Sequence, residues 1–86
     1  MPVKYSAHAR KRMRERSILD SDVEGVLDDP VEVIETKYAR RAAFGRLQTN
    51  DRFVVVVFEV SGEDFLVVTA LKVDGVRARR YGFSRV

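Results

Sequence analysis

The sequence predicts one α+β domain in which two N-terminal helices pack on an antiparallel sheet of about four strands. Apolar residues recur at helical spacing before Pro30 and at alternate positions after it. Two short polar segments, QTND and SGED, divide the second half into pieces of strand length. The chain has 86 residues, which is enough for a single core, so we assign residues 1–86 to one domain.

The first helix is expected over about residues 7–16. Ser6 is a favourable N-cap, and Tyr5, Ala9 and Met13 follow one another at four-residue spacing, which predicts one apolar stripe. The stripe beside it carries polar side chains: His8, Arg12, Glu15 and Arg16. The opposite side is expected to contact solvent or a partner through Arg10, Lys11 and Arg14.

The second helix is expected in LDSDVEGVLDDP. Ser21 and Glu24 have the spacing of a capping box, and Pro30 ends the helix. The buried face would consist of Val23, Val26 and Leu27. Acidic residues at the start of this helix suit its dipole.

Four strands are expected after Pro30. They are VEVIETK (31–37), RRAAFGRL (40–47), RFVVVVFEV (52–60) and DFLVVTALKV (64–73). The following segment, VDGVRARRYG (73–82), is expected to form a further hairpin arm or an irregular tail.

The run Phe53 to Phe58 is apolar at every position, which predicts a central strand covered on both faces. Two short helices can cover only one of these faces. The C-terminal tail, a second copy in a homodimer or a partner protein could cover the other. In the alternative interpretation, the valines are simply good strand residues that stay partly exposed.

The composition predicts a soluble cytoplasmic protein. No apolar run approaches the roughly 20 residues that span a bilayer, and the N-terminus lacks the apolar stretch of a signal peptide. The chain has no cysteine and no HxxxH motif, and many of its carboxylates lie in one acidic helix. Neither a catalytic metal nor another cofactor is therefore expected.

Charge is segregated along the chain. Three basic blocks, residues 1–19, 36–52 and 67–86, carry net charges of +5, +4 and +4. Two acidic blocks, residues 20–35 and 53–66, carry −7 and −3. If the basic blocks converge in space, they form a positive surface that can bind a polyanion such as RNA.

The opening YSAHARKRMRERSILDSDVEGVLDDP resembles a widespread bacterial family of domains of unknown function. Members begin with His-Ala, Arg-Met and Glu-Arg pairs and continue into an acidic helix that ends in Pro. The segments RRAAFGRL, RFVVVVFEV, VVTALKV and RRY match the rest of the pattern, so the resemblance covers nearly the whole chain. The family is similar in layout to the BrnT and RelE-like toxins of bacterial toxin-antitoxin pairs.

The resemblance implies a RelE-like fold and a metal-independent ribonuclease. Such a toxin cuts RNA, with ribosome-associated messenger RNA as one substrate, and is silenced by a cognate antitoxin protein. Catalytic roles are implied for Lys72, Tyr81, Arg80 and His8. RNA-binding roles are implied for Arg12, Arg16, Arg41 and Arg46.

Several of these residues also have a purely structural interpretation. His8 could make hydrogen bonds at the start of a helix, although its ordinary pKa near 6.5 suits acid-base work. Arg16 could cap helix carbonyls, Lys72 could be a solvated strand-end residue, and the ring of Tyr81 could pack on the sheet.

Two other classes of function remain open from the sequence. One is a non-catalytic module that binds RNA or DNA through the same basic surface. The other is a small regulatory protein-interaction domain in which the basic blocks only balance the acidic ones. Aromatic residues among basic ones favour nucleic acid, and here these are Tyr38, Phe44, Tyr81 and Phe83.

Overall fold

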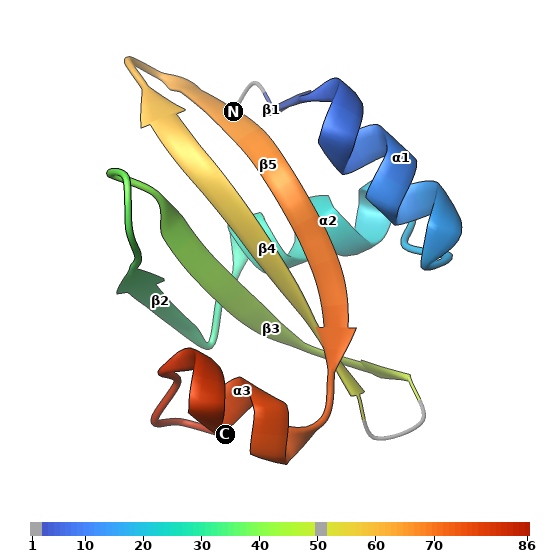
Figure 1. The fold of residues 1–86 in the computed structure, drawn as a ribbon, viewed down its shortest axis with the longest axis vertical. Helices are drawn as coiled ribbons and strands as arrows, with labels where there is room; N and C mark the ends of the chain where they lie inside the picture. Colours follow the sequence, from blue (N-terminus) through green and yellow to red (C-terminus); the bar gives the residue numbers. More distant parts are fainter. Residues whose placement is uncertain (1–2, 50–51) are drawn as a thin grey trace.

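The computed structural model describes the backbone of residues 3–49 and 52–86 and the side chains of 3–45 and 52–86. The described chain forms three helices and five strands, and the strands make one sheet (Figure 1). Their bounds are β1 Val3–Tyr5, α1 Ala7–Glu15, α2 Asp20–Asp28, β2 Glu32–Glu35, β3 Arg41–Thr49, β4 Arg52–Ser61, β5 Asp64–Val73 and α3 Gly75–Tyr81.

The sheet is mixed, with the strand order β1-β5-β4-β3-β2. Strand β1 runs parallel to β5, whereas the other neighbouring pairs are antiparallel. The prediction of two N-terminal helices on a four-stranded antiparallel sheet is therefore wrong. At three residues, β1 is too short to show an alternating pattern. Tyr5, which was counted in the apolar stripe of the first helix, lies in this strand.

The two N-terminal helices begin with different caps. Ser6 caps α1 as predicted, since its hydroxyl oxygen accepts a hydrogen bond from the Ala9 N–H at 3.0 Å. Helix α2 begins earlier than the predicted Ser21 cap. Its first turn is closed by the Asp22 carboxylate, which accepts from the Leu19 N–H at 2.9 Å. Asp22 thus has the position three residues after the cap that was predicted for Glu24.

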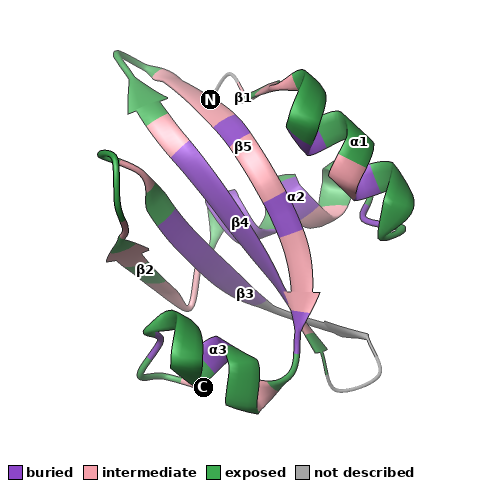
Figure 2. Cartoon of the chain, viewed as in Figure 1, coloured by how far each residue is buried: buried purple, intermediate pink, exposed green. Residues whose placement is uncertain are grey.

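The core has two layers, one on each face of the sheet. Alternation along β4 sends Val54 and Val56 to the face that α1 and α2 cover, called here the α1–α2 face. It sends Val55 and Val57 to the opposite face, which α3 partly covers and which is called the α3 face. The prediction of a central, doubly covered strand is confirmed, and Figure 2 shows β4 buried along its middle.

Part of the cover on the α3 face is a helix that the sequence interpretation missed. Asp74 caps α3, accepting from the Arg77 N–H at 2.8 Å, and Gly82 ends it at φ 121°, where a side chain would be strained. Ala78 is the one buried residue of α3. The prediction of a hairpin arm or an irregular tail was therefore wrong. A helix that buries so little apolar surface has no periodic pattern in its sequence by which it could be predicted.

The C-terminal segment after α3 is held by Glu32 on β2. Its carboxylate accepts hydrogen bonds from the Ser84 N–H, the Ser84 hydroxyl and the Arg85 N–H, at 2.8 to 3.2 Å. Phe83 in this segment is buried in the core of the α3 face, and its ring is edge-on to that of Phe44 with 4.7 Å between the centroids. The chain end is therefore part of the core on the α3 face.

Within the described ranges, no helix is long and apolar enough to cross a membrane. Those residues likewise contain no group of three or more His, Cys, Asp or Glu side chains that could hold a metal ion.

Candidate functional site

A groove of about 570 Å³ lies on the α3 face of the sheet. Its floor is formed by Val57 on β4 and by Val68 and Thr69 on β5. The turn between β2 and β3 lines it from one side, and the C-terminal end of α3 from the other. The remaining lining residues are Glu35, Thr36, Lys37, Tyr38, Arg40, Arg80 and Tyr81.

A β-bulge shapes the floor of this groove. Val57 pairs with Thr69, but the next residue on β4, Phe58, pairs with Val67, which leaves Val68 as an extra residue on β5. Val68 and Thr69 consequently both line the groove, although they are neighbours in a strand. The bulge adds the Thr69 hydroxyl to an otherwise apolar floor.

The β2–β3 turn has an unusual backbone. Tyr38 and Ala39 both have left-handed backbone φ angles, 64° and 56°, which residues other than Gly, Asn and Asp seldom adopt. The turn is closed by the Thr36 N–H and the Thr36 hydroxyl, which donate to the Arg40 carbonyl at 2.8 and 3.1 Å. The Tyr38 side chain is left 84% exposed at the end of this turn.

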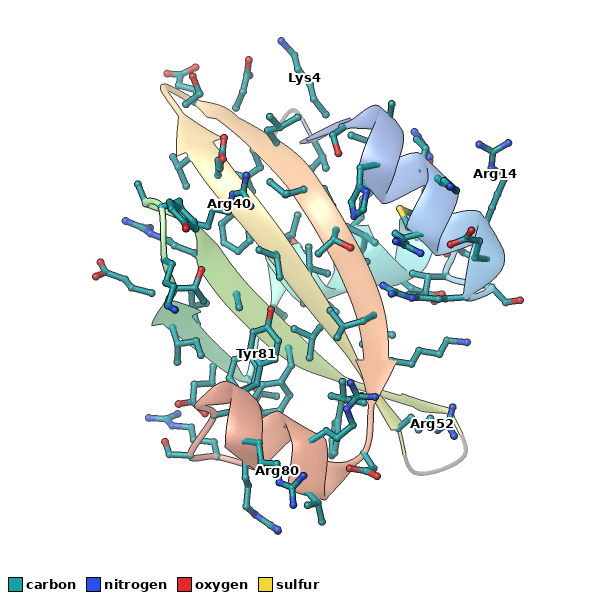
Figure 3. The ribbon with its side chains drawn as sticks, viewed as in Figure 1. Lys4, Arg14, Arg40, Arg52, Arg80 and Tyr81 are labelled. Carbon is teal, nitrogen blue, oxygen red and sulfur yellow. The ribbon has the colours of Figure 1, made fainter. Side chains whose placement is uncertain are left out.

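Tyr81 is placed by the packing beneath it. Its ring is stacked nearly parallel to that of Phe83, with 5.9 Å between the centroids and 10° between the planes. Phe83 is buried against the sheet, so it gives the Tyr81 ring a fixed support. In Figure 3 Tyr81 lies over the sheet, while Arg80 lies on the outer side of α3, at the rim of the groove.

The groove has more positive than negative groups. Lys37, Arg40 and Arg80 are its cations, and Glu35 is its carboxylate. Arg40 Nε is paired with Glu59 Oε1 at 3.0 Å, whereas no ion pair within the described part of the chain includes Lys37 or Arg80. Two cations thus remain available to an anionic ligand.

The sheet separates the predicted catalytic residues into two groups. Arg80 and Tyr81 line the groove on the α3 face. Lys72 lies on the other face, opposite Val54 in the sheet, and its Nζ donates to the Ser17 carbonyl at 3.4 Å. His8 is exposed on α1, the helix that packs on that same face. The four residues therefore do not form one site.

The predicted RNA-binding arginines also lie away from the groove, except Arg46, whose side chain the structure does not describe. Arg16 donates to the Ala70 carbonyl of β5 at 2.7 Å, which holds the end of α1 on the sheet, and Arg12 is paired with Glu15 at 3.0 Å. Arg41 shares the α1–α2 face with Ala43, two positions along β3. The side chain of Arg46 lies outside the described residues.

Sequence reasoning missed most of the groove. Lys37, Arg40 and Thr69 were not singled out, because a turn and a bulge bring them together and neither has an apolar pattern. Tyr38 was noted as an aromatic residue among basic ones. The segment KYAR (37–40) could have indicated this side of the groove. Exposure of a tyrosine ring to water is unfavourable, so a tyrosine between two cations in a turn suggests a ligand-binding residue.

Two carboxyl or phenol groups have shifted pKa values. For Glu32, burial raises the pKa, but the hydrogen bonds from Arg85 and Ser84 outweigh it and leave the pKa below its ordinary value. For Tyr5, burial and the nearby Asp20 and Glu24 carboxylates raise the pKa, against a smaller opposing effect of Arg10. Both groups lie outside the groove, so their shifts concern stability.

The fold is that of a small α+β protein with helices on both faces of one mixed sheet. The described structure is similar to the crystal structure of the Brucella abortus ribonuclease toxin BrnT, with a TM-score of 0.64 and 19% sequence identity, over 86% of this chain and 97% of that one. Residues 5–72 match the family described as Domain of unknown function (DUF4258), and the chain belongs to that family. No curated protein matches the sequence.

These comparisons confirm the predicted resemblance to a domain of unknown function and to the BrnT layout. The family match includes the β2–β3 turn but ends at Lys72, before α3. Two of the lining residues of the groove, Arg80 and Tyr81, therefore lie beyond the matched segment.

Proposed function

We propose that this protein is a metal-independent endoribonuclease that acts as the toxin of a toxin-antitoxin pair, and that RNA binds in the groove on the α3 face. One observation carries the proposal. On a fold shared with a ribonuclease toxin, the groove is lined by Tyr81, whose ring is stacked on Phe83, and by two cations without an ion pair in the described chain, Lys37 and Arg80. This combination suits a phosphodiester substrate.

The proposed reaction needs no metal. The 2′-oxygen of the RNA forms a bond to phosphorus while the bond from phosphorus to the 5′-oxygen breaks, which leaves a 2′,3′-cyclic phosphate and a 5′-hydroxyl. The proton of the 2′-hydroxyl passes to water in the open groove, and the Tyr81 hydroxyl donates a proton to the leaving 5′-oxygen. Solvent then returns a proton to the Tyr81 phenolate, which restores the starting state. Lys37 and Arg80 stabilise the negative charge that develops on the phosphate oxygens.

The first test is RNA cleavage in excess EDTA, with and without ribosomes, followed by analysis of the product ends. We expect cleavage with cyclic phosphate ends in the wild type. Tyr81→Phe keeps the ring that packs on Phe83 and removes only the hydroxyl, so we expect it to reduce cleavage by about 100-fold or more while RNA affinity changes little.

Two outcomes contradict the proposed mechanism. Cleavage that is lost in EDTA and restored by a divalent ion requires a metal. Salt-dependent RNA binding by a wild-type protein that cuts no RNA under either condition instead favours the non-catalytic binding module.

The toxin role is tested in cells. We expect cytoplasmic expression of the wild type to arrest cell growth. Co-expression of a small antitoxin encoded beside it should restore growth. Arrest that persists in Tyr81→Phe contradicts a catalytic origin of the toxicity.

A further inference from the structure

Tyr38 has the greatest exposure among the large apolar and aromatic side chains of the described residues, at 84%. It lines the groove, which also contains Tyr81. Burial of an aromatic ring is favourable. A ring left in water at the edge of a groove is therefore available to a ligand with a flat apolar surface.

The backbone of the β2–β3 turn holds this ring in place. Tyr38 and Ala39 are the two central residues of a tight hairpin turn, and both have the left-handed φ angles that such turns use, although Tyr and Ala seldom adopt them. The hydrogen bonds from Thr36 to the Arg40 carbonyl and the pairing of β2 with β3 maintain this conformation. The Tyr38 ring is therefore presented with little backbone freedom to lose on binding.

The charges beside Tyr38 indicate which flat ligand the turn suits. Lys37 precedes the ring in sequence, Arg40 follows two residues later, and Arg80 lies at the end of the groove formed by α3. A nucleotide in a single strand has the matching composition, because each aromatic base is flanked by phosphates. A duplex fits poorly, since its bases are already covered on both sides by their stacked neighbours.

We propose that Tyr38 stacks on an unpaired base, so that the groove selects single-stranded RNA and favours purines, which present the larger stacking surface. The inference rests on the proposed function only in placing RNA in this groove. It adds the substrate class and a residue that determines it.

The test measures binding without cleavage. The probes are fluorescent 2′-O-methyl oligonucleotides of eight nucleotides: oligo(A), oligo(U), the same backbone with abasic sites, and an oligo(A)–oligo(U) duplex. The variant is Tyr38→Asn, because asparagine tolerates the left-handed conformation and replaces the aromatic ring with a short amide. Tyr38→Trp is the rescue, and Leu19→Ala, at another exposed apolar position outside the groove, is the matched control.

We expect the wild type to bind oligo(A) more tightly than oligo(U), the abasic strand or the duplex. Tyr38→Asn should weaken oligo(A) binding by about 10-fold or more, with abasic binding unchanged, since loss of stacking costs about that much per base. Tyr38→Trp should retain tight binding, and Leu19→Ala should match the wild type.

The remaining outcomes are each decisive. Equal losses for oligo(A) and the abasic strand mean that Tyr38 maintains the turn and does not stack, which overturns the inference. Unchanged oligo(A) binding in Tyr38→Asn, with weakened binding in Arg80→Ala, overturns the inference but leaves RNA in the groove. Absence of RNA binding by the wild type overturns both this inference and the proposed function.

Discussion

Tyr5 shows how a single residue in this small domain combines favourable and unfavourable contacts. Its ring lies beneath the Arg10 guanidinium at 3.9 Å, and its hydroxyl is buried without a hydrogen-bond partner among the described residues. The unmet hydroxyl opposes folding, whereas the contact with the cation favours it.

We therefore predict that Tyr5→Phe raises the free energy of unfolding by about 1 kcal/mol, because it removes the buried hydroxyl and keeps the ring. Urea unfolding of the wild type and the variant measures the difference. A loss of stability would mean that the hydroxyl has a partner in solution.

Neighbouring arginines on α3 provide a matched pair for the groove. Arg80 lines the groove, whereas Arg79, adjacent in the same helix and also exposed, does not. We predict that Arg80→Ala lowers RNA cleavage by about 100-fold and that Arg79→Ala leaves it nearly unchanged, because only the first removes a cation from the phosphate site. Cleavage rates of the two variants and the wild type under single-turnover conditions test this prediction. Equal effects would mean that α3 contributes only general positive charge.

At the scale of elements, α2 and β3 meet at Gly45. A β-carbon there would lie 3.2 Å from Val26 Cγ2 and 3.3 Å from Val26 Cα, so the helix can approach the strand closely only because the side chain is absent. At Gly25, inside α2, a β-carbon would meet no atom within 4 Å beyond the adjacent residues and backbone of its own helix.

The two glycines predict opposite effects. Gly45→Ala should lower the free energy of unfolding by about 1–3 kcal/mol, because it forces α2 away from the sheet. Gly25→Ala should raise it by about 0.5–1 kcal/mol, since alanine favours the helix. Chemical denaturation measures both, and a Gly45→Ala protein as stable as the wild type would contradict the close packing.

The contact of β2 with the C-terminal segment makes stability depend on pH. Since the pKa of Glu32 is below its ordinary value in the folded protein, its stabilising effect is present above the ordinary value of 4.5 and is lost as the pH falls through the lowered pKa. We predict that Glu32→Gln is less stable than the wild type at pH 7 and that the difference shrinks towards pH 3.

Thermal unfolding across that pH range tests the Glu32 contact. Glu63→Gln, in the exposed β4–β5 turn, is the control and should show no such convergence. A constant difference between Glu32→Gln and the wild type would mean that the carboxylate charge does not hold the segment.

The elements that could be predicted from the sequence are those with enough buried residues to form a pattern. The valines of β4 and the apolar residues of α1 and α2 recur at strand or helix spacing, so these elements were expected at nearly their observed positions. Strand β1 and helix α3 bury too few residues for that. The groove depends on a left-handed turn and a bulge at Val68, which are set by packing and by the partner strand.

For the whole molecule, the two faces of the sheet determine which basic blocks lie close together. The block at residues 36–52 contributes Lys37 and Arg40 to the groove, and the block at 67–86 contributes Arg80. The first block contributes helix α1, which packs on the other face. Two of the three basic blocks therefore contribute cations to the same groove.

The central claim is that RNA binds the α3 face, and chemical-shift mapping by NMR with a 2′-O-methyl single strand tests it most directly. The claim predicts that the amide signals of Lys37, Tyr38, Thr69, Arg80 and Tyr81 shift on titration, while those of α1 do not. Shifts that gather instead around Arg12, Arg16 and Lys72 would place RNA on the α1–α2 face and contradict the account.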